Sequence, residues 1–75
     1  MQHCKTINDE RGTVQITVTL IVFQFTPDIN KQWFKYDVLC LHKPKGKKQF
    51  IYSENIATES EISLVKSELW QMLKP

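Results

Sequence analysis

The segment TVQITVTLIVFQF, residues 13–25, decides the fold class. Every even position from Val14 to Val22 is apolar, and the odd positions up to Thr19 hold threonine or glutamine. This alternation with a period of two is typical of a β-strand that buries one of its faces. After Leu20 the odd positions also become apolar, so we expect a bulge or a bend that shifts the phase of this long strand.

Two further segments have the character of strands. Residues 32–42 alternate in the same way, which predicts a core face formed by the even positions from Phe34 to Cys40. Residues 48–53 follow a loop rich in lysine and form the third predicted strand. Short connections of this kind join antiparallel neighbours, so we expect a twisted antiparallel β-meander of three to four strands.

Polar segments separate and precede these strands. The TPDIN sequence at residues 26–30 predicts a turn, because proline presets φ and the Asp and Asn side chains bond to nearby backbone. Residues 1–12 are polar and show no periodicity, which predicts a flexible N-terminal arm. The remaining residues, 13–75, are expected to form a single domain.

The helix start is the clearest local signal in the chain. Thr58 and Glu61 form a capping box, in which each side chain accepts a hydrogen bond from the other residue's backbone amide. The apolar residues that follow at helical spacing are Ile62, Val65, Leu69, Met72 and Leu73. Leu64 lies on the other side of this predicted helix, 59–73, so it should face solvent or a partner. The sequence therefore predicts an α+β fold in which the sheet packs against one C-terminal helix.

The composition excludes several classes of protein. With 41% hydrophobic and 24% charged residues in a chain of 75, the sequence has the composition of a globular domain and not of a disordered one. A net charge of +2 gives no general argument for nucleic acid or membrane. The two cysteines do not form a disulfide framework, and no apolar run approaches the ~20 residues of a membrane span. We expect a cytoplasmic protein.

Metal-binding and catalytic patterns are weak. Cys4, Cys40, His3 and His42 include the right ligand types for zinc, but they lack the usual ligand spacing. No serine or cysteine lies in a recognisable nucleophile motif, and two glycines in the whole chain cannot form a Gly-rich phosphate loop. We therefore expect neither an enzyme nor a bound cofactor or metal.

A basic loop suggests nucleic acid as one partner. Its four lysines are Lys43, Lys45, Lys47 and Lys48. Phe50 and Tyr52 follow them, and bases stack on aromatic rings beside such lysines in single-strand binders. The alternative is that both rings are core residues and the lysines only keep a hairpin in solution.

Apolar residues on a second sheet face suggest a protein partner. Alternation places four apolar residues on the face away from the helix: Trp33, Leu39, Leu41 and Ile51. One helix covers one face, so this second face and Leu64 are expected to bind a protein partner or a second copy of the chain. The alternative is that the N-terminal arm, or the bent half of the first strand, folds over Trp33.

Three short motifs carry a resemblance to a known family. They are IVFQFTP at 21–27, NKQWF at 30–34 and TESEI at 58–62. In this order they resemble the WapI-type immunity proteins of bacteria, over roughly residues 17–73. The resemblance implies a cytoplasmic protein that binds a cognate toxin domain, and it implies no catalytic residue.

Overall fold

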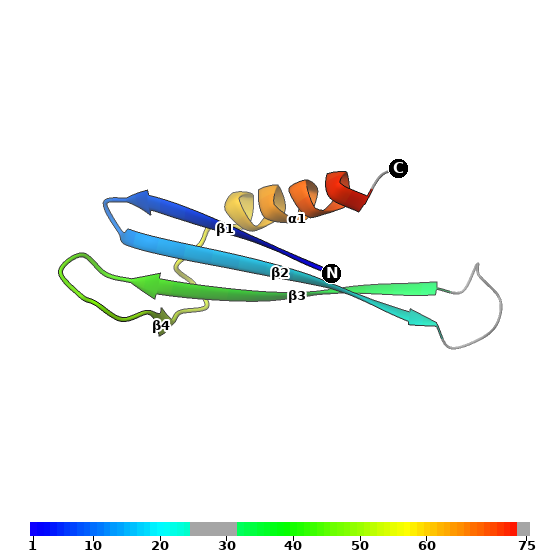
Figure 1. Ribbon diagram of the computed structural model, residues 1–75, viewed down its shortest axis with the longest axis horizontal. Coiled ribbons are helices and arrows are strands. Elements are labelled where there is room, and N and C mark those ends of the chain that lie inside the picture. Colours follow the sequence, from blue (N-terminus) through cyan, green and yellow to red (C-terminus); the bar gives the residue numbers. More distant parts are fainter. Residues whose placement is uncertain (25–31, 74–75) are drawn as a thin grey trace.

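The fold is an antiparallel sheet with one helix. The computed structural model describes residues 1–24 and 32–73, with the side chains of all of these except residues 22–24, 32–34 and 73 (Figure 1). The elements are β1 (Gln2–Asp9), β2 (Gly12–Gln24), β3 (Gln32–Lys43), β4 (Ile51–Tyr52) and α1 (Glu59–Leu73). The strands lie in the order β1-β2-β3-β4, each antiparallel to the next. This confirms the predicted α+β meander; the turn predicted at 26–30 lies outside the described residues.

Strand β1 replaces the flexible arm that was predicted for residues 1–12. It pairs with β2 from Gln2 opposite Thr19 to Asp9 opposite Gly12. The prediction was wrong because a polar sequence carries no hydrophobic alternation from which a strand could be predicted. The segment forms a strand because it pairs with β2 and lies under α1. The tight turn into β2 is held by the Arg11 amide, which donates to Asp9 Oδ1 at 2.9 Å.

Strand β2 contains no bulge where it pairs with β3. The pairing is one-to-one from Thr13 opposite Lys43 to Gln24 opposite Gln32, so the predicted phase shift does not occur. A bend is unnecessary because the strands do not wrap around the core. They continue past α1 as a two-stranded extension, and the molecule measures 52 × 22 × 18 Å (Figure 1). Its radius of gyration of 15.0 Å exceeds the roughly 11 Å of a compact chain of this length.

The core lies between α1 and the first two strands. Its buried residues are Val14, Ile16, Val18, Leu20, Cys40, Val65 and Leu69. Tyr36 packs against this cluster, but Val38, which was predicted to belong to the core, is exposed. The reason is that α1 packs on β1 and β2, which leaves β3 at the margin of the covered area. The even-numbered face of β2 is therefore the covered face, as its alternation predicted.

Candidate protein-binding site

The face of the sheet opposite α1 carries two uncharged rows of side chains. The register aligns Cys4, Thr17 and Leu39 in one row, and Thr6, Gln15, Leu41 and Tyr52 in the next. We call these seven residues the open face. Since neighbouring residues in a strand point to opposite sides, they lie away from the buried even positions of β2. Leu39 is 43% exposed and Tyr52 is 59% exposed, so this surface presents large apolar groups to solvent.

The predicted binding residues do not all lie on this face. Leu39 and Leu41 lie there, as expected. Ile51 pairs with His42 and therefore lies on the α1 side of the sheet, so its assignment to the open face was wrong. Tyr52, opposite Leu41, takes that place, because a shift of one residue moves a side chain to the other face.

Two other predicted contacts stand apart from the open face. Leu64 projects from α1 and is exposed, as its position on the helical wheel predicted. Because α1 covers the opposite side of the sheet, Leu64 cannot share one flat interface with Leu39 or Tyr52. The backbone of Trp33 pairs with Phe23 in the extension of the sheet. Its side chain lies outside those described, so the role of Trp33 stays a prediction.

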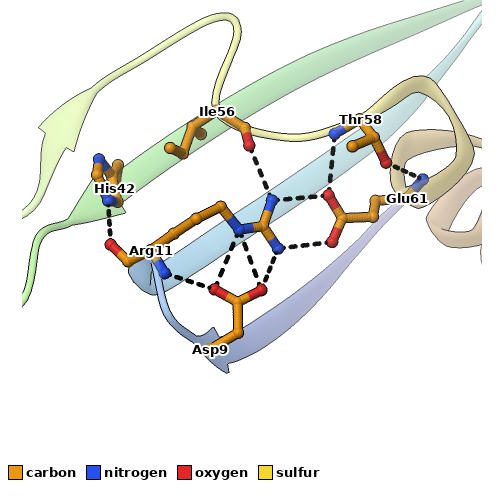
Figure 2. Close-up of polar contacts among 6 residues, drawn as sticks. All are labelled: Asp9, Arg11, His42, Ile56, Thr58 and Glu61. Carbon is orange, nitrogen blue, oxygen red and sulfur yellow. Dashed lines mark hydrogen bonds and ion pairs between the residues drawn. The ribbon is translucent and has the colours of Figure 1, made fainter.

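An arginine cluster connects the β1–β2 turn to the start of α1 (Figure 2). Arg11 donates from Nη2 to Glu61 Oε2 at 2.7 Å and to Asp9 Oδ2 at 2.6 Å. Its Nη1 donates to Glu61 Oε1 and to the carbonyl oxygen of Ile56, both at 2.9 Å. His42 Nε2 lies 2.6 Å from the Arg11 carbonyl oxygen, which can only accept, so this nitrogen is the donor. The cluster fixes the position of α1 over the sheet.

The capping box is part of the same cluster. The Thr58 amide donates to Glu61 Oε1 at 2.9 Å, and the Glu61 amide donates to Thr58 Oγ1 at 3.1 Å, as the sequence predicted. Hydrogen bonds from Arg11, and then from the Thr58 amide, lower the pKa of Glu61 to about 2. The same guanidinium lowers the pKa of Asp9. Both carboxylates are ionised partners of one cation, which is a structural role and not that of a general acid or base.

Sequence reasoning missed Arg11 altogether. Its two carboxylate partners are 2 and 50 residues away, and only the nearer one belongs to a recognisable turn. The available signal was the Asp9-Glu10-Arg11-Gly12 sequence, where an Asx turn and a glycine with φ of +103° form a tight connection. A methyl group at Gly12 would overlap the carbonyl oxygen of Lys43, so this glycine also allows the turn to approach the end of β3.

The four candidate zinc ligands lie in different places. His3 contacts Glu68, at 3.0 Å, on the α1 side of the sheet, whereas Cys4 is on the open face. Cys40 belongs to the core, where burial raises the pKa of its thiol. His42 is bound to the Arg11 carbonyl oxygen. Among the described residues, no group of three His, Cys, Asp or Glu side chains is arranged to hold a metal.

The basic loop is exposed, but the two aromatic residues that follow it, Phe50 and Tyr52, do not form a common surface on which bases could stack. Lys45, Lys47 and Lys48 are exposed, whereas Lys43 is half-buried with Nζ 5.2 Å from the ring centroid of Phe50. Tyr52 lies on the open face and donates to Glu54 Oε1 at 2.8 Å. That carboxylate raises the pKa of Tyr52 and would repel a phosphate next to the ring.

Within the described part of the chain, no helix has the length and apolar character needed to cross a membrane.

Comparisons with known proteins add nothing about the site. The chain matches no protein-family model, no curated protein and no solved structure.

Proposed function

We propose that this protein is a non-enzymatic interaction domain that binds a protein partner through its open face. The observation that carries the proposal is the exposure of Leu39 and Tyr52 on a face that α1 does not cover. The other five residues of the open face are uncharged, and depletion of charge is typical of the centre of protein interfaces. The charged residues Lys35, Asp37 and Lys43 lie on the same side of the sheet, beyond the two ends of these rows. A solvated sheet face more often carries charged side chains.

Several features support the non-enzymatic part of the proposal. Asp9 and Glu61 are both committed to Arg11, and the Cys40 thiol is buried. Cys4 and Cys40 are free cysteines on opposite faces of the sheet, which fits a reducing compartment such as the cytoplasm. The resemblance to WapI-type immunity proteins makes a toxin domain the first class of partner to test.

A photo-crosslinking experiment tests the open face directly. A photoreactive residue at Thr17, in the centre of the open face, should form an adduct with a specific protein in the native cell. The same group at Ser67, which is exposed on α1, is the matched control and should give no such adduct. The adduct at Thr17 should disappear when Leu39→Lys is added. Equal crosslinking from both positions, or none from Thr17, would exclude the open face as the binding surface.

Nucleic acid is the second candidate, because Lys45, Lys47 and Lys48 are exposed within one short loop. Phosphate neutralisation by these lysines would make binding fall steeply as salt rises. Fluorescence anisotropy with single- and double-stranded oligonucleotides at several salt concentrations measures this slope. Lys45→Ala with Lys47→Ala should reduce the slope if the loop binds phosphates. Absence of binding at low salt would rule out this candidate.

A further inference from the structure

The outer edge of β3 is uncovered over most of its length in the described structure. Strand β4 pairs only with Leu41 and His42 of the 12-residue β3. The Ser53 amide extends this contact by one position, donating to the Cys40 carbonyl oxygen at 3.1 Å. Among residues 1–24 and 32–73, no strand pairs with positions 33–39 on this side. An unpaired strand edge of this kind is a template for another strand.

The direction of the backbone groups along this edge follows from two hydrogen bonds. In an antiparallel strand, the N–H and C=O of one residue point to the same side, and successive residues alternate. The bond from Ser53 to Cys40 therefore shows that the even residues of β3, including Tyr36 and Val38, point outward. A second hydrogen bond leads to the same result. The Leu20 amide donates to the Met1 carbonyl oxygen at 2.8 Å, so the backbone groups of the even residues of β2 point to β1 and those of the odd residues point to β3. The odd residues of β3 therefore bond to β2, and its even residues point outward.

We propose that a second copy of the chain pairs with this edge, antiparallel, with Tyr36 opposite Tyr36 of the second copy. In this register, Val38 exchanges hydrogen bonds with position 34 of the second copy, and Leu39 lies opposite position 33. The pairing ends at Cys40, because Ser53 already occupies its carbonyl group. The two four-stranded sheets would join into one continuous sheet with two-fold symmetry.

Charge selects this register. Lys35 and Asp37 are both exposed, point to the same side of the sheet, and lie 3.7 Å apart within one chain. With Tyr36 at the two-fold axis, Lys35 of each copy lies opposite Asp37 of the other. Only the even residues point their N–H and C=O groups outward, so any other register must also place even residues opposite even residues. The two nearest alternatives put Lys35 opposite Lys35, or Asp37 opposite Asp37, and like charges directly opposite are destabilising.

Edge charges also serve to prevent pairing, and this is the rival explanation. A lysine alone is repelled in the register that puts it opposite its own copy and finds an opposite charge in no register. With Lys35 and Asp37 together, the two copies attract each other in one register and repel each other in the neighbouring registers. The charges therefore favour one specific pairing. Beside this edge, a groove between β3 and α1 is lined by Val38, Glu59, Ile62, Ser63 and Lys66.

The β1 edge is a poorer candidate for the same role. Its outward residues, by the same parity, are the even ones, and α1 packs over the strand. The charged side chains of β1 are already committed within the chain. Lys5 Nζ binds Glu68 Oε1 at 2.8 Å, and Asp9 is bound by Arg11. Lys35 and Asp37 also pair within one chain, but at 3.7 Å and with both side chains more than half exposed, so they can change partners more readily than the shorter and less exposed pairs of β1.

Charge reversal tests the register. Sedimentation equilibrium of the full chain at low salt should show a monomer–dimer equilibrium. Lys35→Asp or Asp37→Lys alone should raise the dissociation constant by about tenfold or more, since symmetry introduces two like-charge contacts. The double variant, with both charges exchanged, should restore the wild-type value to within about threefold. The matched controls are Lys47→Asp and Glu10→Lys, which make the same charge changes on exposed turns and should have little effect. A monomeric wild-type protein, or a double variant no better than the single ones, would overturn the proposal.

Proline substitution tests the edge itself. The Val38 amide points outward, so Val38→Pro removes a donor to the second copy and leaves the pairing of β2 with β3 intact. Dimerisation should be lost while circular dichroism and the melting of the monomer are preserved. Thr6→Pro, at an outward position of β1, is the matched control and should still dimerise. A dimeric Val38→Pro variant would contradict the inference; if that variant does not fold, the charge exchange decides. Leu41→Glu on the open face, outside positions 33–39, should leave the dimer intact, which separates this inference from the proposed function.

Discussion

Two leucines on α1 offer a direct test of how the helix packs on the sheet. Leu69 is fully buried against β2, whereas Leu64, one helical turn earlier and on the other side, is 49% exposed. The same truncation to alanine therefore removes a core side chain in one case and a surface side chain in the other. Leu69→Ala should cost about 3 kcal/mol of unfolding free energy, because a lost buried leucine leaves a cavity as well. Leu64→Ala should cost less than about 1 kcal/mol.

The difference is large relative to the stability of the domain. A single core in a chain of this length supplies about 3–5 kcal/mol, so Leu69→Ala should remove most of the stability. With a urea m-value of about 1 kcal/mol/M, the midpoint of unfolding should fall by about 3 M for Leu69→Ala and by less than about 1 M for Leu64→Ala. Equilibrium urea unfolding, followed by circular dichroism and tryptophan fluorescence, measures both midpoints. If Leu64→Ala were as destabilising as Leu69→Ala, the face of α1 that packs on the sheet would be wrongly assigned.

Three further outcomes follow from the turns, the capping box and the cysteines. The pKa of Glu61 is lowered from 4.5 to about 2, so its contribution to stability is complete above pH 4.5 and is lost as the pH falls towards 2. Over this range of pH, the urea midpoint should therefore fall less for Glu61→Gln than for the wild type. Gly12→Ala should lower stability by about 1 kcal/mol or more, because its φ of +103° disfavours a Cβ and the Lys43 carbonyl oxygen would overlap it. Gly46 also has a positive φ, of +81°, but a Cβ there meets open space, so Gly46→Ala should cost less; thermal melting measures both. A thiol reagent should modify Cys4 in the native protein and Cys40 only after denaturation; rapid modification of both would contradict the burial of Cys40.

The parts of the fold that sequence predicts are those with strong local signals. The even positions of β2 and the capping box of α1 each report on their own conformation within a few residues, and both are confirmed. Strand β1 has no such signal. Its alternate residues His3, Lys5 and Asp9 are partly buried on the side that α1 covers, where Glu68 of α1 binds the first two and Arg11 of the following turn binds Asp9. Polar residues that gain partners through tertiary contacts look like a loop when they are considered alone.

The uncovered face of the sheet was predicted in kind but not residue by residue. That one helix leaves one face uncovered follows from counting elements, and Leu39 and Leu41 follow from alternation along β3. The face of Ile51 depends on how β4 aligns with β3, which no local pattern determines across a loop of exposed lysines. The role proposed for Lys35 and Asp37 could not be predicted from the sequence either, because it depends on which edge of the sheet remains unpaired.

The open face and the β3 edge meet at Leu39, and the proposed dimer would bring two open faces together. A two-fold axis perpendicular to the sheet keeps both copies of α1 on one side, so the two open faces would adjoin on the other. A partner large enough to contact both faces would bind the dimer more tightly than the monomer, and by linkage it would strengthen dimerisation by the same factor. Mixing the partner with Val38→Pro should then give weaker binding than the wild type, although every residue of the open face is retained. Equal affinity for both proteins would mean that the partner contacts one copy only.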